Sequence, residues 1–125
     1  MHKRIAFIFL AAISLTPAAA APAVTGVDLA NFSFTPMTIQ LRAGVPTVLR
    51  LHNASGGGHN FSAPQFFAAS QIQPQSLALV RKGKVEVPGG ATIDIALTPR
   101  AGQYPLKCSH PFHATFGMKG TIIVR

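Results

Sequence analysis

The sequence predicts an all-β sandwich of about seven to eight short strands, and three observations support this fold class. Apolar and polar residues alternate over short stretches, beginning with Val27 and Leu29, as half-buried strands require. Turn-forming residues are frequent, because the 125 residues include 11 glycines and 10 prolines that separate the apolar runs. The runs at 45–51 and 120–124 are rich in β-branched and aliphatic residues, which favour strands.

The individual strands are expected where apolar runs lie between turn residues. Pro36, Gly44 and the Pro88-Gly89-Gly90 triplet are clear breaks, and the stretch 52–58 is an expected flexible loop. In chain order the expected strands are 24–34 (interrupted near Asn31), 38–42, 45–51, 59–62, 77–80, 85–87, 92–97, 103–107 and 120–124.

Residues 64–73 form the one segment where a short helix is expected. Phe66, Phe67 and Ile72 fit the apolar face of one or two helical turns. Pro64 and Pro74 bracket the segment, so any helix here must be brief.

The N-terminus is typical of an export signal. Lys3 and Arg4 precede an apolar run of about 11 residues, shorter than the ~20 that a membrane-spanning helix needs. Small residues follow, and cleavage after Ala20 or after Ala23 fits equally well. We therefore expect a signal peptide at 1–23, a single domain at 24–125 without a membrane span, and a periplasmic or secreted location.

The chain is strongly basic. Eleven Lys and Arg residues against three acidic residues give a net charge of +8, and removal of Lys3 and Arg4 leaves +6. Such a charge favours acidic proteins or anionic surfaces as partners. Nucleic acid is not expected as a partner, because the protein is expected to be exported and its basic residues are scattered.

The only cysteine, Cys108, lies in a stretch rich in metal-binding side chains. A lone cysteine in an exported protein pairs with another chain, stays free or binds something, and His113 and Met118 nearby favour binding. A thiolate, an imidazole and a thioether together suit copper, which must be held as both Cu(I) and Cu(II). Such a site needs a second imidazole, and His59, which follows three glycines, is placed to supply it.

The spacing of these residues resembles a known family. Cys108, His113 and Met118, each separated by four residues, resemble the copper loop of the cupredoxins, the blue-copper proteins of the plastocyanin and azurin kind. His59-Asn60 resembles the family's first histidine ligand and the asparagine after it, and the resemblance extends over residues 27–124. It implies a Greek-key β-sandwich that binds one copper ion, with His59, Cys108 and His113 as a trigonal ligand set and Met118 as a weak axial ligand.

The second histidine ligand has two candidates, His110 and His113. His113 has the family spacing to Met118, whereas His110, two residues after Cys108, would have to reach the same metal through a very tight ring. We expect His113 to be the ligand and His110 to lie beside the site or at the surface.

The resemblance implies one-electron transfer rather than enzymatic catalysis, because four protein ligands leave no evident open position on the metal. Electrons are expected to leave through His113, with Phe112 and Phe116 forming an apolar rim around it. The expected partners are acidic redox proteins, and the protein itself is expected to be a monomer. A periplasmic copper carrier, chaperone or buffering protein is the alternative. An enzyme with an opened axial position is less favoured, because the sequence offers no general base nearby.

Overall fold

The computed structural model describes residues 2, 5–15 and 21–125. The basic start of the expected signal, Lys3 and Arg4, and most of its expected cleavage region, 16–20, lie outside the described residues. Residues 5–15 are exposed and form neither helix nor strand. Within the described ranges, no helix has the length and apolar character needed to cross a bilayer.

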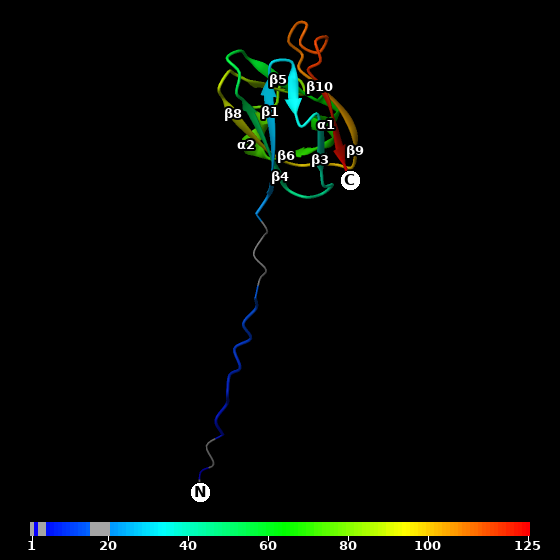
Figure 1. Cartoon of the computed structure of the whole chain (residues 1–125). Helices are drawn as coiled ribbons and strands as arrows, with labels where there is room; N and C mark the ends of the chain where they lie inside the picture. Colours follow the sequence, from blue (N-terminus) through cyan, green and yellow to red (C-terminus); the bar gives the residue numbers. More distant parts are fainter. Residues whose placement is uncertain (1, 3–4, 16–20) are drawn as a thin grey trace.

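Two five-stranded sheets make up the folded part of the chain (Figure 1). The first sheet has the order β2-β1-β4-β8-β6, with β1 (Ala23–Ala30), β2 (Ser33–Thr35), β4 (Thr47–Asn53), β6 (Gln71–Ile72) and β8 (Thr92–Thr98). The second has the order β3-β10-β9-β5-β7, with β3 (Thr38–Leu41), β5 (His59–Ser62), β7 (Lys84–Val87), β9 (Gly102–Lys107) and β10 (Lys119–Val124). The all-β sandwich expected from the sequence is therefore confirmed.

The described residues form ten strands because two very short segments also pair. The expected interruption near Asn31 is a turn between β1 and β2, whose register places Leu29 opposite Phe34. The two residues of β6 pair with the end of β8. Strand β4 also extends through His52 and Asn53, which were expected in the following loop, because His52 lies opposite Thr92 of β8.

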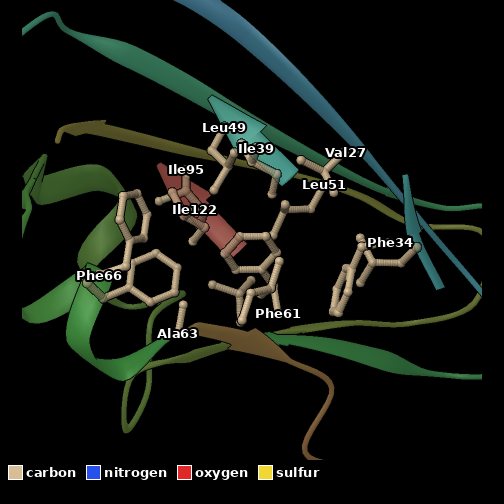
Figure 2. Packing of buried hydrophobic residues seen from close by; sticks show 14 of the residues in the cluster. Val27, Phe34, Ile39, Leu49, Leu51, Phe61, Ala63, Phe66, Ile95 and Ile122 are labelled. Atoms are coloured by element: carbon tan, nitrogen blue, oxygen red, sulfur yellow. The ribbon is translucent and has the colours of Figure 1, made fainter. Parts of the chain in front are cut away.

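The core lies between the two sheets and is built from the inward-facing side chains of alternating strand positions (Figure 2). Strand β4 shows this alternation clearly, with Leu49 and Leu51 fully buried and Arg50 exposed between them. Phe61 packs edge-to-face against both Phe34 and Phe67, with ring centroids 5.9 Å apart in each pair. Burial of each such side chain stabilises the fold by about 1.5–3 kcal/mol, so the sandwich has a substantial core without a metal.

The expected helix is present, whereas the strand expected at 77–80 is not. Helix α1 (Pro64–Ala69) buries Phe66 and Phe67 and ends before β6. A second short helix, α2 (Pro74–Leu77), begins at Pro74, whose fixed φ suits the first helical turn. The chain then continues in turns closed by hydrogen bonds from Leu79 N to Ser76 O and from Val80 N to Leu77 O. The prediction of a strand was wrong, because Pro74 begins a helix and the backbone groups that follow bond locally in turns instead of pairing with another strand.

Candidate metal centre

His59 is the first residue of β5, and only 3% of it is exposed. The glycine-rich loop before it is anchored by Asn53, whose side-chain amide donates hydrogen bonds to the carbonyls of Gly57 (2.8 Å) and Val87 (2.9 Å). The Ser55 backbone N–H donates in turn to Asn53 Oδ1 at 3.0 Å. This loop is therefore tied to β7, and Asn53 is a positioning residue that the sequence analysis missed. Its signal was an asparagine three residues before a glycine run, since asparagine and glycine are both frequent in turns.

The loop between β9 and β10 carries Cys108, His113 and Met118 and projects from one end of the sandwich (Figure 1, orange). Cys108 N donates to Met118 O at 3.0 Å, and Met118 N donates to His113 O at 2.9 Å. Two residues adopt the left-handed backbone region, Gly117 at φ 106° and Phe112 at φ 67°. These hydrogen bonds close the loop on itself, so its three metal-binding residues return to one place.

Three of the four expected ligands come together at this end of the sandwich. One ligand atom from each of His59, Cys108 and His113 lies within 4.8 Å of those from the other two. The Nδ1 atoms of the two histidines are 3.1 Å apart, and Cys108 Sγ lies 3.4 Å from His113 Nδ1. Cys108 and Met118 are fully buried, so the cluster faces the interior while His113 lies at its partly exposed side.

Asn60 connects the two segments that carry these ligands. Its backbone N–H donates to Cys108 Sγ at 3.4 Å. Its side-chain oxygen accepts the Ser109 N–H at 2.8 Å, and its side-chain nitrogen donates to Ser109 Oγ at 2.7 Å. The side-chain amide of Asn60 thus holds Ser109, the residue after Cys108, through two hydrogen bonds.

His110 is turned away from the cluster of ligand atoms. Its Nε2 lies 2.9 Å from Glu86 Oε2, while Glu86 Oε1 accepts a hydrogen bond of 2.9 Å from Asn60 Nδ2. Partial burial raises the pKa of the Glu86 carboxyl, but the hydrogen bonds from Asn60 and His110 and the charges of His110 and Lys84 outweigh it and lower the pKa below 4.5. Glu86 was not recognised from the sequence, because only the pairing of β5 with β7 brings it beside Asn60.

The electrostatic setting favours a neutral His59. Burial lowers the pKa of His59 below its ordinary value of 6.5, and positive charge on His113 or His110 lowers it further. Neutral imidazole is the form that binds metals. Two imidazole nitrogens, one cysteine sulfur and a buried thioether fit a single type 1 copper ion, because soft sulfur and borderline nitrogen donors together suit copper in both oxidation states.

Aromatic residues surround the exposed side of the site. Phe112 and Phe116 are 71% and 66% exposed, as expected for a rim around His113. Phe32, from the turn between β1 and β2, joins them: its ring centroid is 5.3 Å from that of His113 and 5.5 Å from that of Phe116. Phe32 was expected in the strand 24–34, and only the fold places it at this rim.

A two-sheet β-sandwich with a buried His-Cys-His cluster and a nearby methionine at one end defines a cupredoxin-type copper protein. The family model for the cupredoxin-like domain matches residues 3–124, and the chain belongs to this family. No curated protein matches the sequence.

Solved structures of similar fold include several auracyanins. The dithionite-reduced auracyanin of Roseiflexus castenholzii is 17% identical, with a TM-score of 0.62 over 86% of this chain and 99% of that one. Auracyanin A, a blue copper protein of Chloroflexus aurantiacus, is 19% identical, with a TM-score of 0.58 over 84% of this chain and all of that one. The multicopper oxidase McoA of Aquifex aeolicus is 18% identical with a TM-score of 0.61, but this chain covers only 31% of it. At these identities the likeness concerns the fold.

Proposed function

We propose that this protein is an exported type 1 copper protein that carries single electrons between redox partners. His59, Cys108 and His113 would hold the copper ion, and Met118 would be its axial ligand. The observation that carries the proposal is the convergence of these two imidazoles and one thiol within 4.8 Å beside a fully buried methionine. Copper held by such donors supplies a reversible one-electron couple between Cu(II) and Cu(I).

The chain's own residues suit that couple because hydrogen bonds connect the segments that carry the donors. Asn60 ties the strand of His59 to the residue after Cys108, and the Cys108–Met118 hydrogen bond closes the loop. Ligands that are held by surrounding hydrogen bonds move little when the metal changes charge. The partly exposed His113, surrounded by Phe32, Phe112 and Phe116, is the proposed route for the electron.

Burial favours an electron carrier over a copper carrier or chaperone. A chaperone must pass its metal to a partner's ligands, which requires accessible sulfur atoms. Cys108 and Met118 are 0% exposed, and 3% of His59 is exposed, so the sulfur donors are closed to an incoming ligand. An enzyme is not proposed, because the family fold and the three converging ligands beside a buried methionine suit electron transfer as the simpler chemistry.

The protein would act outside the cytoplasm, after removal of the N-terminal signal. Strand β1 begins at Ala23, which pairs with Thr47 and donates a hydrogen bond to Pro46 O at 3.1 Å. Cleavage after Ala20 would leave this strand whole, whereas cleavage after Ala23 would shorten it. We therefore propose Ala20 as the processing site, which mass spectrometry of the exported protein would test.

The central test is a visible spectrum of the purified protein after addition of Cu(II). We expect an intense charge-transfer band that ascorbate bleaches and an oxidant restores over repeated cycles. Cys108→Ser should abolish the band, because the thiolate is its source. A colourless wild-type protein, or a band that Cys108→Ser leaves intact, would refute the proposed site. Rapid loss of Cu(I) to a competing chelator would instead favour the copper carrier.

A further inference from the structure

A cleft with two lysines lies beside the proposed metal centre, on the second sheet. Its volume is about 410 Å³, and it forms where the start of α1 meets β9 and β10. We call it the lysine cleft. It is lined by Ser62, Pro64, Gln65, Pro105, Leu106, Lys107, Lys119 and Gly120.

The two lysines of this cleft are direct neighbours across two strands. Lys107 of β9 lies opposite Lys119 of β10 in the antiparallel register. Side chains of directly opposed residues project from the same face of a sheet, and like charges in such a pair repel each other. Across residues 2, 5–15 and 21–125, neither lysine forms an ion pair, since the ion pairs found there are Arg50–Asp94 and His110–Glu86. Both ammonium groups are therefore available to an external anion.

The remainder of the lining restricts which anion would fit. Pro64 and Pro105 present apolar surface, and Ser62 adds a hydroxyl group. Such a cleft suits a carboxylate on a short apolar stem, because the stem can contact the prolines while the charge lies near the lysines. Aspartate and glutamate side chains of a polypeptide have this chemistry.

The cleft also lies close to the proposed ligands along the chain. Lys107 immediately precedes Cys108, and Lys119 immediately follows Met118. Cys108 and Met118 are themselves joined by the backbone hydrogen bond of 3.0 Å. A protein that docks in the cleft would therefore contact two residues that are adjacent in sequence to proposed copper ligands.

We propose that the lysine cleft binds an acidic segment of the redox partner, with a carboxylate between Lys107 and Lys119. The proposal rests on the proposed electron-carrier function and specifies where its partner docks. Nine Lys and Arg residues against three acidic residues in the exported part of the chain steer an acidic partner toward the protein generally. The pair of Lys107 and Lys119 defines where the acidic segment binds, which the basic residues scattered over the rest of the surface do not.

The experiment uses copper(I)-loaded protein, an acetylated and amidated Leu-Glu-Glu-Leu peptide as probe, and amide chemical shifts as the readout. We expect titration at low salt to shift the amides of Gln65, Lys107, Lys119 and Gly120. In the double variant Lys107→Gln/Lys119→Gln, the peptide Kd should rise by roughly three- to tenfold, the effect expected of two exposed charge pairs. Lys82→Gln, which removes one exposed charge in the turn before β7, is the matched control and should leave the Kd within twofold of wild type. Lys107→Gln and Lys119→Gln should each raise the Kd more than Lys82→Gln does.

The proposal would be overturned by shifts centred on the basic turn 81–84, by equal loss of affinity in Lys82→Gln and in the single cleft variants, or by no binding to the wild-type protein. Free glutarate that binds as tightly as the peptide would also overturn it, because the cleft would then be a small-anion site. The same samples are then oxidised to the Cu(II) form, and the visible band and its bleaching by ascorbate are recorded. Absence of the visible band would contradict the proposed copper function. An intact band without peptide binding would contradict only the proposed role of the lysine cleft.

Discussion

Glu86 Oε2 lies within hydrogen-bond distance of His110 Nε2, at 2.9 Å, at the edge of the proposed metal centre, and Oε1 of the same carboxylate accepts a hydrogen bond from Asn60. One acidic side chain on β7 therefore holds both the strand of His59 and the loop of Cys108. The pair also explains why His110 is not needed as a ligand, because its Nε2 is directed at Glu86 rather than at the cluster of ligand atoms.

Replacing Glu86 with glutamine should raise the reduction potential of the copper form. A negative charge near the site favours Cu(II) over Cu(I), and a unit charge at ~10 Å contributes roughly 0.4 kcal/mol in water and roughly 1.7 kcal/mol at an effective dielectric constant of 20. We therefore expect a positive shift of roughly 20–70 mV by voltammetry, with the visible band retained. Asp94→Asn is the control, because Asp94 pairs with Arg50 on the other sheet. A shift equal to that of Asp94→Asn would contradict a local role for Glu86.

Removing the imidazole of His113 should open the proposed copper site, whereas removing that of His110 should not. His113 Nδ1 lies 3.4 Å from Cys108 Sγ, while His110 pairs with Glu86. In His113→Gly the visible band should be lost or altered, and added imidazole should restore it. In His110→Ala the band should change little. If imidazole rescued His110→Ala and not His113→Gly, the assignment of the two histidines would be reversed.

Copper should stabilise a protein that already folds without it. The buried core between the sheets is built mainly from Leu, Ile, Val and Phe side chains, so calorimetry should find a cooperative transition in the apo protein. Copper at a thousandfold excess over its Kd adds about 4 kcal/mol, which raises Tm on the order of 15 °C for a domain of this size. Cys108→Ser should lose most of this increment. An apo protein without a transition would show that the metal is required for folding.

The Glu86 carboxylate should make the apo protein less stable in acid. Its pKa is lower in the folded protein than the ordinary value of 4.5, so the unfolded chain binds this proton more tightly. The stabilisation is therefore complete above the unfolded pKa and disappears as the pH falls through the folded pKa. Lys84, Asn60 and His110 are the groups that lower it. In urea titrations from neutral to acidic pH, the stability difference between wild type and Glu86→Gln should shrink below pH 4.5. A difference independent of pH would contradict this linkage.

The sequence by itself determined the fold class and the chemistry of the site. Alternation along β4 and the frequent turns depend only on neighbouring residues, and so does the spacing of Cys108, His113 and Met118. A short loop whose metal-binding residues are separated by intervals of four residues can bring their ligand atoms to one point. The structure brings His59 to the same point, as expected. The same local signals failed at 77–80, where apolar side chains lie exposed in a helix end and turns that begin at Pro74.

Tertiary structure decided which residues surround the site, because their partners are distant in sequence. Glu86 reaches Asn60 only through the register of β5 and β7, and Phe32 meets His113 only when the β1–β2 turn lies beside the metal loop. The opposition of Lys107 and Lys119 likewise depends on the register of β9 and β10. A slip of one residue in any of these pairings would turn the side chains to the opposite face. Composition and residue spacing do not specify the strand register, which is set when the two sheets pack around their common core.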